Sequence, residues 1–259
     1  MDLGLKGRTA IICASSRGLG KACAIALANE GCKVIINGRH ADRLHETAEE
    51  IKALTHSPVI EVVADISTPN GQKALLGKCP DPDILVNNNH GPAFRHFRQI
   101  DRTAMIDGII QNMVTPVELI KAVIDKMVAK KFGRIINITS TSVYVPIAGL
   151  DLSSGARAGL TSFLAGIART VVADNVTINN LLPGPFLTDR LEQSFKAASE
   201  KTGATAHEVM EKRKQENPAK RFGNPEEFGQ ACAFLCSDKS GFITGQNLII
   251  DGGAYLSAF

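Results

Sequence analysis

The chain has 259 residues, of which 44% are hydrophobic, and a formal net charge of +3. This composition suits one α/β domain with a full core, and the weak, scattered positive charge excludes the basic footprint of a nucleic-acid-binding protein. No stretch approaches the roughly 20 apolar residues that cross a bilayer, so no membrane partner is expected.

Short runs rich in Val and Ile alternate with segments of helical periodicity. The expected strands are Thr9–Ala14, Lys33–Asn37, Val59–Ala64, Asp83–Asn87, Arg134–Ile138, Thr177–Leu182 and Asn247–Asp251. The expected helices are Gly20–Glu30, Ala41–Leu54, Pro69–Lys78, Thr103–Lys131 with a kink or break at Pro116, Ser154–Ala173 and Pro225–Ser237. Apolar strands joined through helices indicate a doubly wound, Rossmann-like parallel sheet of seven strands, in a single domain over 1–259.

A glycine-rich segment follows the first expected strand and opens the first helix. It reads Ala14, Ser15, Ser16, Arg17, Gly18, Leu19, Gly20. Small residues let the backbone approach a pyrophosphate, and the free N–H groups of a helix start donate to it. The position between strand and helix favours a phosphate loop over a purely structural turn.

The end of the second expected strand bears on the choice of cofactor. An enzyme that uses NAD places an acid there, whereas the 2′-phosphate of NADP requires positive charge. This chain has Arg39 at that point and Arg17 in the phosphate loop. The pair favours NADP(H) over NAD(H), although simple solvation could also account for either arginine.

Several segments together resemble the short-chain dehydrogenase/reductase family, whose phosphate loop reads Thr-Gly-x-x-x-Gly-x-Gly. Further matches are the run 86–91 with its three asparagines, the run 137–140, the run 179–184 with Thr188, and the C-terminal runs 221–227 and 251–253, which are typical of 3-oxoacyl-carrier-protein reductases. The resemblance implies cofactor contacts from Ser15, Ser16, Arg17, Gly18, Leu19, Gly20, Arg39, Asp65, Ile66, Asn87, Asn88, Pro183, Gly184 and Thr188. Asp65 could instead cap the helix that begins near Pro69.

The same resemblance identifies a divergent catalytic site. Ser140 matches the catalytic serine and Asn112 the asparagine that holds a water in a proton relay. The family's Tyr-x-x-x-Lys is replaced, because Ser153 stands where the tyrosine belongs and Arg157 where the lysine belongs. The spacing of four keeps both side chains on one helical face, but a serine hydroxyl is a far weaker acid than a phenol.

Three other routes could supply the proton that the missing tyrosine would donate. Tyr144 lies four residues after Ser140, and His90 follows the fourth expected strand. A water held by Asn112 is the third route. The simpler alternatives are that Tyr144 only packs against its neighbours and that His90 is only a solvated surface residue.

Three functions are therefore considered. The first is an NADP(H)-dependent reductase that converts the carbonyl of a small-molecule or acyl-thioester, 3-oxoacyl-like substrate into an alcohol. The second is a dinucleotide-binding sensor or scaffold without catalysis. The third is a lyase related to the halohydrin dehalogenases, which pair Ser and Tyr with Arg but rebuild the phosphate loop with bulky residues.

The remaining expectations concern the surroundings of the site. The charged segment 191–222 lacks strand patterns, and the resemblance makes about 187–222 a variable substrate lid. Family members are usually homotetramers or homodimers, so an assembly of that kind is expected here. The six cysteines lack metal-ligand spacing, so no metal is expected, and reduced thiols indicate a cytoplasmic protein. Arg8 and Thr9 interrupt any apolar run near the N-terminus, so no signal peptide is expected.

Overall fold

The computed structural model describes residues 1–257, apart from the side chain at position 201. Its centre is a parallel sheet of seven strands, as the sequence predicted, and their order is β3-β2-β1-β4-β5-β6-β7. The strands are β1 (Thr9–Ile12), β2 (Lys33–Gly38), β3 (Val59–Val63), β4 (Ile84–Asn87), β5 (Gly133–Ile138), β6 (Val176–Pro183) and β7 (Asn247–Ile250). Each differs from its predicted range by one or two residues at an end.

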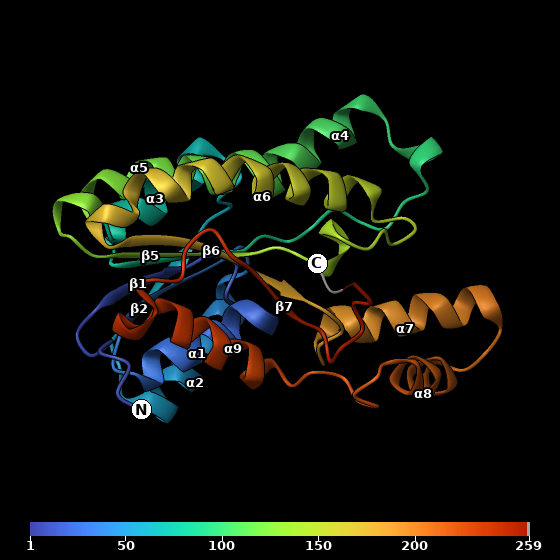
Figure 1. Cartoon of the computed structure of the whole chain (residues 1–259). Helices are drawn as coiled ribbons and strands as arrows, with labels where there is room; N and C mark the ends of the chain where they lie inside the picture. The colour runs from blue at the N-terminus through green and yellow to red at the C-terminus, as the bar shows by residue number, and fades with distance from the viewer. Residues whose placement is uncertain (258–259) are drawn as a thin grey trace.

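Helices cover both faces of the sheet (Figure 1). They are α1 (Gly18–Asn29), α2 (Ala41–Thr55), α3 (Pro69–Lys78), α4 (Arg102–Ile109), α5 (Thr115–Ala129), α6 (Asp151–Val171), α7 (Asp189–Thr202), α8 (Ala206–Glu216) and α9 (Pro225–Cys236). Short turns of other helix types are η1 (Phe97–Gln99), η2 (Ile110–Val114), η3 (Thr141–Val143), η4 (Val172–Asp174) and η5 (Asp238–Ser240). In Figure 1, α3, α5 and α6 lie above the sheet, and α1, α2 and α9 lie below it.

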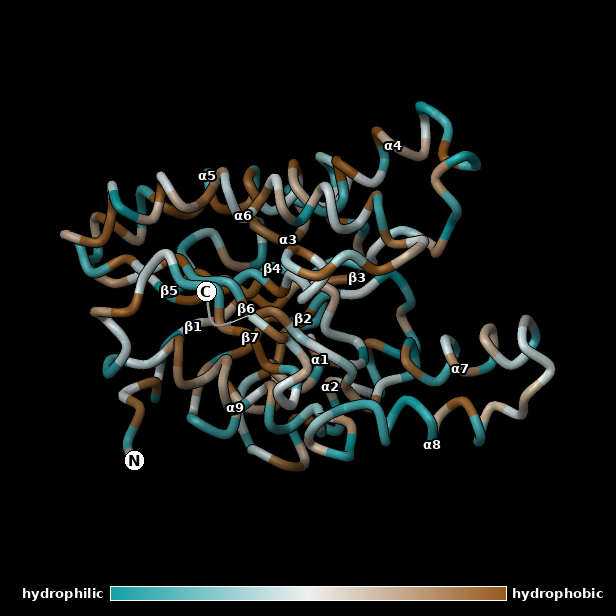
Figure 2. The backbone as a smooth tube through the Cα atoms, turned by 45° about the vertical axis from the view of Figure 1, so that its right-hand side comes forward, coloured by the Kyte–Doolittle hydropathy of each residue, from teal (hydrophilic) through white to brown (hydrophobic). Residues whose placement is uncertain are grey.

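The core consists of two apolar layers separated by the sheet. Successive side chains of a strand point to opposite faces. Ala10 and Ile12 of β1 therefore pack with α1, α2 and α9, while Ile11 packs with α3, α5 and α6. Figure 2 shows the hydrophobic segments gathered along the central strands and hydrophilic ones along α8. All six cysteines are free and buried, and burial raises the pKa of Cys13 to about 12.

The long helical segment predicted over Thr103–Lys131 is interrupted, as its proline indicated. The interruption is the π-type turn η2, which comes just before Pro116 rather than at it. Pro116 lies in the first turn of α5, directly after η2, and its missing N–H removes a hydrogen bond to the preceding turn, which accounts for the interruption there. No helix in the described part of the chain is both long and apolar enough to cross a membrane.

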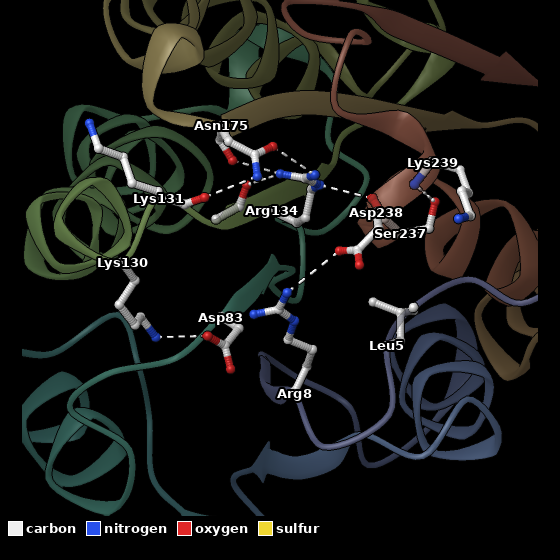
Figure 3. Close-up of polar contacts among 12 residues, drawn as sticks. Leu5, Arg8, Asp83, Lys130, Lys131, Arg134, Asn175, Ser237, Asp238 and Lys239 are labelled. Atoms are coloured by element: carbon white, nitrogen blue, oxygen red, sulfur yellow. Dashed lines mark hydrogen bonds and ion pairs between the residues drawn. The ribbon is translucent and has the colours of Figure 1, made fainter.

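A buried arginine ties the sheet together at the amino end of β5 (Figure 3). Arg134 is 1% exposed and donates from Nε to the Ser237 carbonyl over 3.0 Å. Its Nη1 donates to the Asn175 carbonyl over 2.7 Å, and its Nη2 to Asn175 Oδ1 over 3.0 Å. Because Ser237 directly follows α9, the cation also lies at the negative end of that helix dipole. The hydrogen bonds of Arg134 thus stabilise the fold at this end of the sheet.

Candidate functional site

The carboxyl ends of the first six strands open into one cavity of about 820 Å³. It brings together most of the residues that the sequence singled out. Those that line it are Ser16, Arg17, Gly18, Leu19, Arg39, Asp65, Ile66, Asn88, Ser140, Ser153, Arg157, Pro183, Gly184 and Thr188. Five others, Ser15, Gly20, Asn87, Asn112 and Tyr144, do not line it. Residues of α7 and α8 also line the cavity, so the segment expected to form a lid lies against it.

The phosphate loop has the backbone geometry that a close approach to phosphate requires. Gly18 has φ +56, in the left-handed region that favours glycine, and it begins α1. A Cβ at Gly20 would lie 2.5 Å from the Ala14 carbonyl oxygen, so that position admits no side chain. Ala14 has φ 45 and carries the strain that the family's glycine avoids. The loop fits a dinucleotide pyrophosphate at the helix start.

Ser15 lies beneath the loop and braces it. Its side chain is buried, donates to the Ile12 carbonyl over 2.7 Å, and accepts from the Asn37 N–H over 3.0 Å. Asn37 in turn accepts from the Ala14 N–H over 3.3 Å and donates to the Val62 carbonyl over 3.0 Å. Ser15 therefore shapes the site through the backbone of β1 and β2, while the surface toward the cavity belongs to its neighbours Ser16, Arg17 and Gly18.

The rim near β2 is rich in arginine. Arg17 pairs with Asp189 over 3.3 Å, and Arg39 approaches Asp65 at 3.9 Å. Both arginines are partly exposed, and Arg43 of α2 also lines the cavity. The sequence reasoning missed Arg43, although its place four residues after Arg39 on the following helix could have indicated it.

Asp65 follows β3 and does not cap the next helix. Burial alone would raise its pKa, but hydrogen bonds from the Ser67 hydroxyl and N–H hold the pKa below its usual value. The cap of α3 is Thr68, whose Oγ1 accepts from the Gly71 N–H over 3.1 Å. The alternative of a capping aspartate is therefore wrong, and Asp65 presents a carboxylate to the cavity instead.

Ser140, Ser153 and Arg157 lie at the β5 end of the cavity. The Ser140 Oγ accepts from the Ser142 N–H over 3.1 Å. Arg157 is 8% exposed, donates from Nε to Ser153 Oγ over 3.2 Å, and donates from Nη1 to the Ile138 carbonyl over 2.5 Å. Burial, and then the charge of Arg190, lower the pKa of Arg157 to about 10, so the guanidinium stays charged at neutral pH.

Asn87 belongs to a chain of side-chain hydrogen bonds that crosses the sheet. Its Nδ2 donates to Asn137 Oδ1 over 2.9 Å, and Asn137 Nδ2 donates to Asn180 Oδ1 over 3.1 Å. Asn180 donates to Asn247 over 2.7 Å, and Asn247 donates to the Tyr144 hydroxyl over 2.7 Å. The chain joins β4 to β7 and holds Tyr144 at the β7 edge. Tyr144, expected from the sequence as a possible proton donor, does not line the cavity.

Asn112 lies in the π-type turn η2, behind the cavity wall. Its Nδ2 donates to the Gly108 carbonyl over 3.1 Å, and its buried Oδ1 has no hydrogen-bond partner among the described residues. A second cavity of about 320 Å³ lies alongside and is lined in part by Gly108 and Gln111. Ser153 and Leu150 line both cavities, so Ser153 stands at the partition between them.

His90 and Arg190 complete the cavity wall. Partial burial, followed by the charges of Arg190, Arg39 and Arg17, lowers the pKa of His90. His90 is therefore neutral at neutral pH and a weak proton donor in the cofactor-free protein. Sequence reasoning missed Arg190, although a third arginine two residues after Thr188 is a signal it could have used.

One group of metal-ligating residue types occurs in the described part of the chain, outside the cavity. Ligand atoms of His45, Glu49 and Glu61 lie within 4.8 Å of one another on α2 and β3. Glu49 already pairs with Lys52 over 2.7 Å. The sequence indicated no such group, because β3 and α2 meet only in the fold.

Comparisons with known proteins agree with this geometry. A family model described as enoyl-(acyl carrier protein) reductase matches residues 13–255. The NADPH-dependent reductase BacG of Bacillus subtilis is 31% identical over 96% of this chain and 98% of its own length. The 3-oxoacyl-[acyl-carrier-protein] reductase FabG of Vibrio cholerae is 31% identical over 98% and 100%. L-sorbose reductase from Gluconobacter frateurii, solved with NADPH and L-sorbose, is 29% identical with a TM-score of 0.93, over 99% and 100% of the two chains.

Proposed function

Because this chain belongs to the short-chain dehydrogenase/reductase family of NAD(P)-dependent oxidoreductases, we propose that it is an NADP(H)-dependent reductase of a 3-oxoacyl-like carbonyl. One observation carries the proposal. A single cavity joins the phosphate loop and its arginine-rich rim to Ser140, Ser153 and Arg157. A cofactor held by the loop would therefore lie against the residues that can polarise a carbonyl.

The dinucleotide is bound by the chain's own groups at three places. The start of α1 at Gly18 receives the pyrophosphate, and Arg17 and Arg39 receive the 2′-phosphate. Pro183, Gly184 and Thr188 line the part of the cavity beyond β6. NADPH supplies the hydride when bound.

The serines orient the substrate oxygen and Arg157 stabilises its charge. Ser140 accepts from the Ser142 N–H and Ser153 accepts from Arg157, so each hydroxyl proton remains free to donate to a carbonyl. The buried charge of Arg157, next to Ser153, favours the alkoxide that hydride addition creates. The proton itself comes from water, since neither serine is acidic enough at neutral pH.

The test is turnover of NADPH with a panel of 3-oxoacyl thioesters, β-keto esters, free 3-oxo acids and aldehydes. Wild type should consume NADPH with at least one 3-oxo compound, and Ser140→Ala should lower kcat/KM by roughly 10²-fold. Ser154→Ala is the matched control, because the Ser154 hydroxyl is buried without a partner and does not line the cavity. Cofactor binding without any turnover would instead favour a sensor or scaffold.

The preference for NADPH has its own test. Arg39→Ala combined with Arg17→Ala should raise the Kd for NADPH by roughly 10²-fold while leaving the Kd for NADH within a few-fold. Arg169→Ala is the control, since Arg169 is an exposed arginine of α6 far from the cavity lining. Equal losses for both cofactors would contradict a role in binding the 2′-phosphate.

Two features of the family are proposed with the function. Residues 187–222 serve as a substrate lid, supported by the lining that α7 and α8 provide. A homotetramer or homodimer is supported by exposed apolar side chains on α4 and α6, including Met105, Ile106 and Phe163. Sedimentation velocity at micromolar concentration tests the assembly, and a monomer would contradict it.

A further inference from the structure

Arg157 and Arg190 line the cavity without an ion pair to any described residue, as do Arg43 and Arg213. Arg17 and Arg39, in contrast, approach the carboxylates of Asp189 and Asp65. Arg157 donates from Nε and Nη1 to neutral oxygen atoms, and its Nη2 has no hydrogen bond to a described residue. Arg190, at the start of α7, makes no ion pair or hydrogen bond with any residue that the structure describes.

The guanidinium groups of Arg157 and Arg190 converge on one place, above Gly91. A Cβ built at Gly91 would lie 3.1 Å from Arg190 Nη1 and 3.5 Å from Arg157 Nη2. Both groups therefore reach the same point, and the glycine leaves that point free of side-chain atoms. Two guanidinium groups from different segments therefore lie next to one another at the wall of the cavity.

Such an arrangement is unfavourable unless an anion completes it. Arg157 is almost fully buried, and the charge of Arg190 adds to burial in lowering its pKa. Partial burial, and then the charge of Arg17, lower the pKa of Arg190 as well. Arg190 remains exposed to the cavity, so a ligand can reach the pair. Two like charges held close together are stabilised by a bound anion, and two guanidinium forks suit the two oxygens of a carboxylate or phosphate.

We propose that Arg157 and Arg190 bind the carboxylate of the substrate, so that the reduced compound is a free oxo acid rather than a neutral ester or thioester. This assignment rests on the proposed reductase function and narrows its substrate class. Arg157 is hydrogen-bonded to Ser153, so a carboxylate on the arginines places the adjoining carbonyl beside the serine hydroxyls.

A phosphate oxygen of the cofactor shares this chemistry, but the topology favours the substrate. Arg157 binds the carbonyl of Ile138 at the end of β5, whereas the phosphate loop follows β1. Strand β4 lies between those two strands, which separates them by roughly 10 Å at the usual strand spacing. Arg190 lies nearer to the phosphate loop, because its neighbour Asp189 pairs with Arg17, so Arg157 is the group that assigns the anion to the substrate.

The experiment measures binding of malonate, a dicarboxylate that cannot be reduced, to the protein saturated with NADP⁺. Isothermal titration calorimetry should show malonate binding at least about tenfold more tightly than neutral malonamide. Arg190→Met should remove that preference. Arg213→Met is the control, because Arg213 is an exposed arginine of α8 that also lines the cavity but already donates to Ser194.

Three results would overturn the assignment. They are equal affinities for malonate and malonamide, an unchanged preference in Arg190→Met, or competition between malonate and NADP⁺ with a tenfold loss of NADP⁺ affinity in Arg190→Met. The last result would assign the anion to the cofactor. Arg190→Met removes no hydrogen bond or ion pair to a described residue, so a melting curve like that of wild type is expected. Failure of the reductase proposal is separate, because it appears as absent turnover while malonate binding persists.

Discussion

The Nε of Arg157 donates a hydrogen bond to the Oγ of Ser153 across 3.2 Å, one helical turn apart on α6. The pair thus keeps the facing geometry of a tyrosine–lysine pair with different chemistry. Ser153 also stands between the main cavity and the second one of about 320 Å³. There is consequently room on its far side for a larger side chain.

Restoring the family pair should accelerate reduction. The double substitution Ser153→Tyr with Arg157→Lys supplies a phenol whose ordinary pKa of about 10 a neighbouring ammonium can lower. We expect kcat with NADPH and a 3-oxo substrate to rise at least about tenfold, since general acid catalysis contributes roughly 10²–10⁴-fold. Arg157→Lys alone should lower kcat. Stopped-flow absorbance of NADPH measures both, and a double variant no faster than wild type would indicate that the site performs another task.

Binding of NADP⁺ should add a proton to His90. Partial burial and the charges of Arg190, Arg39 and Arg17 hold its pKa below 6.5 in the cofactor-free protein. The cofactor's phosphates offset those charges, so the pKa of His90 rises and protons are taken up on binding at mildly acidic pH. Calorimetry in buffers of different ionisation enthalpy measures this uptake. It should largely disappear in His90→Gln and persist in His207→Gln, which removes an exposed histidine of α8. Release of protons when NADP⁺ binds would contradict the predicted rise in the pKa of His90.

Relieving the strained alanine of the phosphate loop should stabilise the protein. Ala14 has φ 45, a region that costs a residue with a Cβ about 1–2 kcal/mol, whereas glycine adopts it freely. Part of the gain is lost because glycine raises the entropy of the unfolded chain, so Ala14→Gly should stabilise by about 0.5–1 kcal/mol. Urea unfolding measures the change. The control Ala206→Gly, at the start of α8 where φ is not positive, should not stabilise.

Removing the buried arginine of the sheet should be costly. Arg134→Met leaves the carbonyls of Ser237 and Asn175 without their guanidinium donor and should destabilise by about 2–4 kcal/mol. Arg169→Met, at an exposed position of α6, should change stability by less than about 0.5 kcal/mol. Denaturant unfolding compares the two variants. Equal, small effects would mean that water replaces the lost donor.

Local sequence patterns were enough to predict the sheet, the helices that cover its two faces and the phosphate loop, but they did not indicate α7 and α8. Each of the predicted features depends on patterns within a few residues. Alternating strand and helix periodicity placed β1 to β7 within one or two residues, and the Gly18 and Gly20 spacing located the loop. The replacement of the expected dyad by Ser153 and Arg157 was equally legible, because it is a matter of residue identity at a fixed spacing.

The tertiary structure alone decided which side chains share the site. Tyr144 is close to Ser140 in sequence, yet the asparagine chain ending at Asn247 holds it at the β7 edge. Arg157 and Arg190 come from separate helices and meet over Gly91, which no local pattern encodes. The periodicity of apolar residues indicates which face of each segment is buried. Whether two charged side chains meet depends instead on the order of the strands and on the paths of the loops. The missing dyad is therefore a fact of the sequence, and the paired arginines beside it are a fact of the fold.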